Sequence, residues 1–190
     1  PDRTEAAAWG DLNNDGLLDL ILGVHPTGFP VNPNDPNDFD YILFNNGNST
    51  FTRISHPVDL SFLGRATLAL VLTDIDFDND LDVYLLNDRY HGNVMLRNDG
   101  PGCIDWCFTE ISLANGSDVP ANSMGIAVAD YDNDSDWDMS YSDIDTHLFL
   151  KNNGTGGNLV FNEVSDSIGI EFDNGAGWGT LMYDADNDGR

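Results

Sequence analysis

Four segments of the chain repeat one spacing of oxygen-bearing side chains. Each has Asp or Asn at its first, third and fifth positions, and the three complete segments add an Asp at the ninth. The residues at these positions and at the seventh are Asp11, Asn13, Asp15, Leu17 and Asp19; Asp74, Asp76, Asp78, Asp80 and Asp82; Asp130, Asp132, Asp134, Asp136 and Asp138; and Asp184, Asp186 and Asp188. The fourth segment reaches only its seventh position, Arg190, the last residue of the chain.

This spacing suits a hard cation such as Ca²⁺, which takes six to eight oxygen ligands at about 2.3–2.6 Å. Alternate residues of a tight loop can aim three side-chain oxygens at one point. We predict that the seventh residue adds its backbone carbonyl and the ninth a bidentate carboxylate. The chain would then hold about four Ca²⁺ sites, the fourth incomplete. The alternative, four acidic turns that bind no metal, is disfavoured by the shared register.

The sixth position of each segment needs a sharp turn. Gly16 and Gly189 suit such a turn, Asn79 tolerates it, and Ser135 suits it least. The segments are not EF-hands, because an EF-hand has Glu at position 12 and helices on both sides. Position 12 is Leu22, Leu85 or Tyr141 here, and the residues that follow position 9 are typical of strands.

The repeat is longer than the acidic segment, because the first aspartates are 63, 56 and 54 residues apart. Each unit has an apolar segment, the acidic loop, a strand-like segment, a third apolar segment that ends in an Asn-rich turn, and a fourth strand. Four strands per unit predict an all-β fold of β-propeller blades, with about three blades and the start of a fourth. The expected repeats are residues 5–60, 65–118, 122–170 and 175–190, which together form one partial propeller. Phe51, Phe108 and Phe161 occupy matched positions and are predicted to pack between blades.

The composition excludes some classes of partner. The formal net charge is -26, and only 7 residues are Lys or Arg, so nucleic acid and anionic membranes are poor partners. No apolar run is long enough to cross a membrane. The hydrophobic content of 41% allows a folded core. The chain lacks an initiator Met, so we interpret it as a piece of a longer protein that carries the missing blades.

Several short features leave alternatives open. Cys103 and Cys107 predict a local disulfide in an oxidising compartment, with two free thiols as the alternative. Residues 25–40 form a Pro-rich insertion, which is either a tolerated surface loop or a partner-binding loop. Asn-x-Ser/Thr sequons are present in a number close to that expected by chance, so glycosylation stays open. They begin at Asn48, Asn115, Asn133 and Asn153.

Residues 11–23, from Asp11 through the Leu-rich segment to Gly23, resemble the FG-GAP (VCBS-type) repeat of integrin α-subunit propellers. The acidic loop is followed by the pattern Leu-Phe-x-Asn-Asn-Gly and then by Phe-x-x-Ile/Val. This pairing makes the repeats more similar still to those of cartilage acidic protein and ASPIC/UnbV-like proteins. The resemblance implies a seven-bladed, Ca²⁺-bearing propeller that is secreted, periplasmic or on a cell surface, with ligands at the loop positions named above. Asn79 and Ser135 depart from the loop glycine of that family.

Two functions compete. The first is a non-enzymatic adhesion or recognition module with structural Ca²⁺, whose loops bind an unidentified protein or glycan. The second is the scaffold of a secreted enzyme such as a polysaccharide lyase. The chain contains no recognisable catalytic motif, and its four histidines are interpreted as structural or surface residues. Recognition is therefore favoured, with no catalytic residue assigned.

Overall fold

A computed structural model of the chain describes residues 3–26, 38–54, 65–103, 106–144, 146–170 and 175–186. These residues form three four-stranded sheets, and in each sheet consecutive strands pair antiparallel with their neighbours. The first sheet contains β1 (Thr4–Gly10), β2 (Asp19–Val24), β3 (Tyr41–Asn45) and β4 (Phe51–Arg53). The second contains β5 (Thr67–Thr73), β6 (Asp82–Asn87), β8 (Val94–Gly100) and β9 (Cys107–Glu110). The third contains β11 (Gly125–Ala129), β12 (Asp138–Ser142), β13 (Leu148–Asn152) and β14 (Phe161–Glu163).

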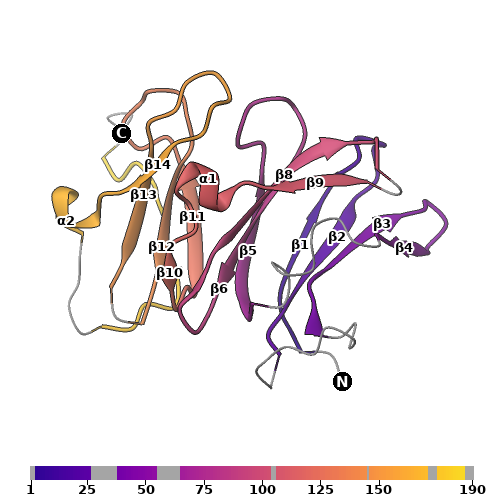
Figure 1. Cartoon of the computed structure of the whole chain (residues 1–190), viewed down its shortest axis with the longest axis horizontal. Coiled ribbons are helices and arrows are strands. Elements are labelled where there is room, and N and C mark those ends of the chain that lie inside the picture. The colour runs from indigo at the N-terminus through magenta and orange to yellow at the C-terminus, as the bar shows by residue number, and fades with distance from the viewer. Residues whose placement is uncertain are drawn as a thin grey trace.

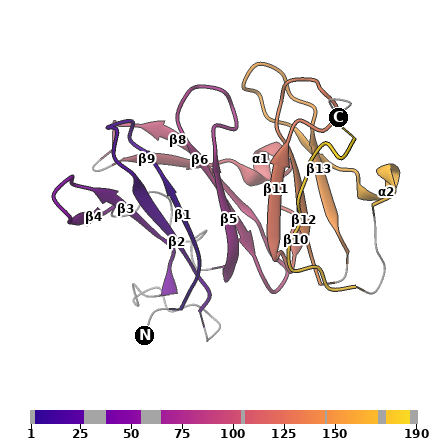
Figure 2. The ribbon, with the colours of Figure 1, turned by 180° about the vertical axis from the view of Figure 1, so that it is seen from behind.

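The three sheets stand side by side as propeller blades do, with their first strands β1, β5 and β11 adjacent (Figures 1 and 2). This confirms the expected all-β fold of four-stranded antiparallel blades. The part of the chain that the structure describes does not close into a ring. A small sheet of β7 (His91–Gly92) and β10 (Pro120–Ala121) was not predicted. Two single-turn helices, α1 (Ser112–Asn115) and α2 (Ser165–Ile168), follow the last strands of the second and third sheets.

The core lies between neighbouring sheets, and β6 contributes to both of its halves. Side chains alternate across a strand, so Val83 and Leu85 face the first sheet while Tyr84 and Leu86 face the third. All six residues of β6 are buried. A strand with both faces covered is continuously apolar, as this one is except at its two ends.

The matched phenylalanines show that this packing is directional. Phe108 packs in the core between the first and second sheets, and Phe161 packs in the core between the second and third. Phe51 is instead 41% exposed and contacts the ring of Trp9. The prediction of inter-blade packing is therefore wrong for Phe51. The reason is that each of these rings packs toward the preceding sheet, and no described residues form a sheet before the first.

Residues 176–183, the expected first strand of the fourth repeat, are not a strand in the structure. The first strand of each sheet forms its ladder with the second strand of the same sheet. The second strand that would pair with residues 176–183 in the same way would come after Asp186, which is the last described residue. Trp178, Leu181 and Tyr183 in this segment are highly exposed. Among the described residues, no helix has the length and apolar character needed to cross a membrane.

Candidate metal centres

The three complete acidic loops connect the first and second strands of the three sheets. We call them loop 1 (residues 11–19), loop 2 (residues 74–82) and loop 3 (residues 130–138). Each starts directly after the first strand of its sheet, and its ninth residue is the first residue of the second strand. The loops are neighbours in space, because Asn14 of loop 1 contacts Asn79 of loop 2, and Trp137 of loop 3 contacts Asp74 of loop 2.

The backbone of each loop turns sharply at the predicted position. At position 6, φ is 84° in Gly16, 76° in Asn79 and 73° in Ser135, so all three adopt the left-handed conformation that glycine favours. Position 4 is also left-handed in every loop, which the sequence did not reveal. The residues concerned are Asn14 (φ 56°), Phe77 (φ 62°) and Asn133 (φ 62°). The three loops therefore share one conformation despite their different sequences.

The first aspartate of each loop holds this conformation. Its two carboxylate oxygens accept hydrogen bonds from the backbone N–H groups of positions 5 and 6. In loop 2, Asp74 accepts from Asp78 and Asn79, each at 3.0 Å. Asp11 and Asp130 make the equivalent contacts at 2.8–3.1 Å. The loop thus folds around its first carboxylate by local side-chain-to-backbone bonding.

The ninth aspartate joins each loop to the hairpin between the third and fourth strands. One oxygen of Asp82 accepts from the backbone N–H of Ile75 at 2.9 Å, and the other accepts from Asn98 at 2.8 Å. Asp19 and Asp138 repeat this pattern with the hairpin residues Asn45 and Asn152. All three carboxylates are fully or almost fully buried. Burial raises the pKa of Asp82 to about 7 and also raises the pKa values of Asp19 and Asp138.

The carboxylates of loops 2 and 3 converge closely enough to bind one ion. Ligand atoms of Asp74, Asp76 and Asp78 lie within 4.8 Å of one another, as do those of Asp130, Asp132 and Asp138. Loop 1 has a neutral amide oxygen at the equivalent third position, on Asn13.

These two loops also contain buried oxygens that accept no hydrogen bond. Within the described residues they are Oδ1 of Asp76, Asp80, Asp132 and Asp136. Burial and the neighbouring carboxylates raise the pKa values of Asp80 and Asp136 to about 7. A buried oxygen without a partner is costly, and a hard cation would satisfy it. The donor set therefore fits a divalent cation with oxygen ligands.

The sequence matches the FG-GAP-like repeat family over residues 11–85 and again over residues 74–141. Each match starts at the first aspartate of one loop and ends in the strand that follows the next loop. The two matches together cover more than half of the chain. The chain belongs to the FG-GAP-like repeat family. Repeats of this kind are typical of extracellular proteins. No curated protein matches the chain.

The fourth FG-GAP-like loop is only partly described. Asp184 and Asp186 lie on the C-terminal segment beside the third sheet, and Asp188 lies outside the described residues. The fourth metal site therefore stays a prediction.

Neighbouring FG-GAP-like repeats are linked by side chains that sequence reasoning did not assign to the site. The indole of Trp137 donates to the carbonyl of Asp74 at 3.0 Å, and its ring stacks on Phe77. Asn98 donates at 2.8 Å to the carbonyl of Leu12 in loop 1. The sequence indicates only a turn at the recurring Asn of each hairpin. This Asn follows the ninth aspartate by 26, 16 and 14 positions in the three repeats, so no fixed spacing marks the contact.

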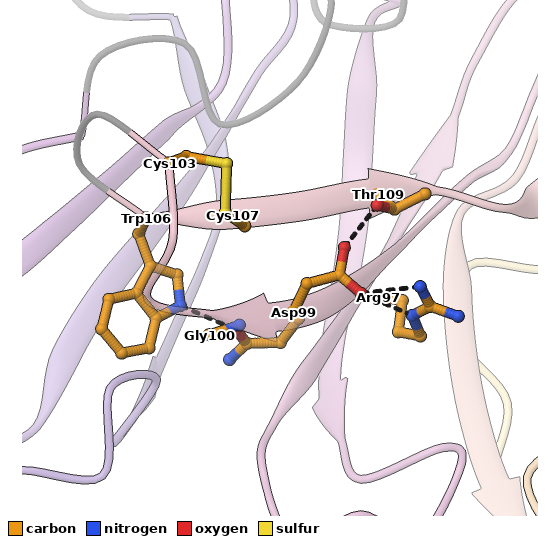
Figure 3. The surroundings of a disulfide bond; sticks show 8 residues. Arg97, Asp99, Gly100, Cys103, Trp106, Cys107 and Thr109 are labelled. Carbon is orange, nitrogen blue, oxygen red and sulfur yellow. Dashed lines mark hydrogen bonds and ion pairs between the residues drawn. A yellow bond between two sulfur atoms is a disulfide. The ribbon is translucent and has the colours of Figure 1, made fainter.

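The disulfide between Cys103 and Cys107 confirms the predicted pairing, and it lies close to this network (Figure 3). Trp106 lies inside the small loop that the disulfide closes. Its indole donates to Asn98 at 2.7 Å, and its ring packs edge-on against Phe44 of the first sheet. The disulfide loop thus holds an aromatic side chain between the first two repeats.

A second group of polar side chains lines a cavity of about 830 Å³ between the third sheet and the C-terminal segment. The hydroxyl of Ser140 lies 2.8 Å from Nε2 of His147 and 3.1 Å from the hydroxyl of Thr180. Burial lowers the pKa of His147, so its ring is neutral at pH 7. Sequence reasoning found no signal for this pair beyond the presence of an isolated histidine.

Proposed function

We propose that this chain is a calcium-binding recognition module of an extracellular protein, in which Ca²⁺ has a structural role. One observation carries the proposal. Loops 1 to 3 share left-handed residues at positions 4 and 6, and loops 2 and 3 contain converging carboxylates with buried, unpartnered oxygens. Without a cation, these carboxylates repel one another and lack part of their solvation.

The choice of Ca²⁺ follows from the donors. They are carboxylate, amide and carbonyl oxygens, without the sulfur or imidazole ligands that favour transition metals. Bound Ca²⁺ would neutralise the clustered charge of the loops. Mg²⁺ is smaller and releases its water reluctantly, so it fits a flexible loop of this kind poorly.

Recognition is the function that this arrangement supports best. The loops occupy connections between strands, where binding residues are commonly placed on a rigid scaffold. The ligand would be a protein or a glycan, because the charge of -26 disfavours nucleic acid. Of the insertion at residues 25–40, residues 27–37 lie outside the described part of the structure, so its role stays a prediction.

The test is thermal unfolding of the full chain with chelator, with Ca²⁺ and with an equal concentration of Mg²⁺. Binding to the folded state at a hundred times the dissociation constant stabilises by about 2.7 kcal/mol per site. We expect chelator to lower the melting temperature and Ca²⁺, but not Mg²⁺, to restore it. A melting curve that responds to neither chelator nor Ca²⁺ would refute the calcium assignment.

The enzyme alternative has one observation in its favour, the cavity that contains Ser140 and His147. A polysaccharide lyase needs a base near the substrate and a positive group beside the sugar carboxylate. His147 could supply the base, but the described residues that line the cavity include Asp130 and Asp184 and neither Lys nor Arg. Incubation with acidic and neutral polysaccharides tests this alternative, because lyase activity would produce new ultraviolet absorbance.

A further inference from the structure

The hairpins that contact the ninth aspartates differ in one charge. Asn45, Asn98 and Asn152 occupy equivalent positions, because the backbone N–H of each donates to the ninth aspartate of its repeat. The residues that precede these three asparagines are, in chain order, Phe44, Arg97 and Lys151. This position therefore carries no charge beside loop 1 and one positive charge beside each of loops 2 and 3.

Lys151 forms an ion pair with one carboxylate of loop 3. Its ammonium contacts Oδ2 of Asp132, and only about a quarter of either side chain is exposed, 26% for Lys151 and 25% for Asp132. The other oxygen of Asp132 is one of the buried atoms without a partner in the described residues. Asp132 also belongs to the converging group of loop 3. The ammonium therefore neutralises a carboxylate of the group that would hold the metal ion.

Arg97 forms its ion pair within its own hairpin, although its charge also opposes the raised pKa of Asp76 in loop 2. Its guanidinium contacts Oδ1 of Asp99 at 2.7 Å, and the other oxygen of Asp99 accepts from Thr109 (Figure 3). The residue equivalent to Asp99 in the third hairpin is Asn153, which is neutral. Lys151 thus has no competing carboxylate at that position and reaches Asp132 instead. The two hairpins therefore differ both in the cation, Arg97 against Lys151, and in the neighbouring carboxylate, Asp99 against Asn153.

We propose that Lys151 is a built-in competing cation that weakens Ca²⁺ binding at loop 3 relative to loop 2, and that Asn153 permits this by leaving its ammonium without a carboxylate in its own hairpin. The inference rests on the proposed calcium function. An incoming Ca²⁺ must displace the ammonium from Asp132 and then bind beside a positive charge. Both steps oppose binding at loop 3, whereas Asp99 already compensates the charge of Arg97 at loop 2.

Calorimetric titration of the full chain with Ca²⁺ tests the proposal. Asp134→Asn removes one charge from loop 3 but keeps a side-chain oxygen that can accept from the N–H of Asp136. The step of the titration that this substitution weakens is therefore the loop 3 step. Lys151→Met removes the ammonium and keeps a similar side-chain length. We expect it to tighten the loop 3 step about tenfold, the effect of one partly screened charge on a divalent ion. Arg97→Met is the matched control and should change each step by less than about threefold, the effect of an exposed, already compensated charge.

Asn153→Asp tests the second half of the proposal without replacing Lys151 or any loop residue, although it removes the hydrogen bond that the Asn153 amide donates to the carbonyl of Lys151 at 3.3 Å. It should tighten the loop 3 step by drawing the ammonium away from Asp132. In the Lys151→Met background, the same substitution should have much less effect, because no ammonium remains to divert. An equal gain in both backgrounds would show that the introduced carboxylate acts only as an added negative charge, and would overturn the role given to Asn153. Bacterial expression avoids glycan at this sequon.

The outcomes separate the two proposals. If Ca²⁺ binds and Lys151→Met leaves the loop 3 step unchanged, the competing-cation inference is wrong and the calcium function stands. If the unsubstituted chain binds no Ca²⁺ and its melting temperature does not respond to Ca²⁺, both are wrong. Melting in chelator checks that each variant is folded.

Discussion

Asp40 is a buried carboxyl that joins the first two sheets, and its replacement by Asn has an effect that can be worked out from its contacts. Only 8% of the residue is exposed. Its Oδ1 accepts from the backbone N–H of Val24 at 2.6 Å, and its Oδ2 accepts from the hydroxyl of Thr67 at 3.0 Å. Burial raises the pKa of Asp40 from 3.8 to about 6, although both hydrogen bonds act in the opposite direction.

The sign of the pH dependence follows from this shift. The folded state holds the proton more tightly than the unfolded state, so the free energy of unfolding falls as pH rises from about 4 to about 6 and then stays low. A shift of about two pKa units corresponds to roughly 3 kcal/mol. The amide introduced by Asp40→Asn would mimic the protonated carboxyl, since its oxygen can accept from Val24 and its nitrogen can donate to Thr67. The hydroxyl of Thr67 could then donate to Asn87, whose Oδ1 lies 3.2 Å away.

We therefore expect Asp40→Asn to raise the melting temperature at pH 7.5 by roughly 5–10 °C, since 1 kcal/mol shifts a protein of this size by about 2–4 °C. The gain should vanish near pH 4, where both side chains are neutral. The measurement is thermal unfolding of both proteins across this pH range at constant Ca²⁺. The acidic loops are the same in both proteins, so the difference between the two melting temperatures cancels their titration. A variant that is less stable at pH 7.5, or a difference that does not change with pH, would contradict the reasoning.

Two further substitutions test the disulfide and the ninth position. Replacing Cys103 and Cys107 by Ser should lower the free energy of unfolding by about 2 kcal/mol, because the closed loop is short. The fluorescence of Trp106 should report the loosened loop. Unchanged stability would argue that the disulfide does not hold Trp106 in place. With Ca²⁺ present, Asp82→Ala should lower the melting temperature more than Asp80→Ala, because it leaves two buried N–H groups without acceptors, at about 1–3 kcal/mol each. Equal effects of the two substitutions would contradict the role given to the ninth position.

The repeated fold could be predicted from the sequence because its signals are local. Alternating apolar residues, Asn-Gly and Asp-Gly turns and a period set by the aspartates each depend on neighbours in the chain. Tyr84 and Leu86 were recognisable as strand residues for this reason. Their division from Val83 and Leu85 between two cores depends on sheets that are distant in sequence. The exposure of Phe51 has the same origin, because it depends on which sheet is its neighbour.

The candidate site was predicted in part for a similar reason. The residues of each loop are contiguous, so the spacing alone indicated a metal site and the left-handed turn at position 6. The hairpin contacts of the ninth aspartate join residues up to 26 positions apart, such as Asp19 and Asn45. The ion pair of Lys151 with Asp132 crosses 19 positions. No periodic pattern encodes contacts of that kind, so only the structure reveals them.

The directional packing of the sheets has a consequence for how such a chain can change length. Each repeat presents a ring such as Phe108 to the sheet before it and accepts a ring such as Phe161 from the sheet after it. A duplicated repeat would therefore carry surfaces complementary to both of its new neighbours. Gene duplication can lengthen this kind of array one whole repeat at a time, and each added unit brings its own acidic loop.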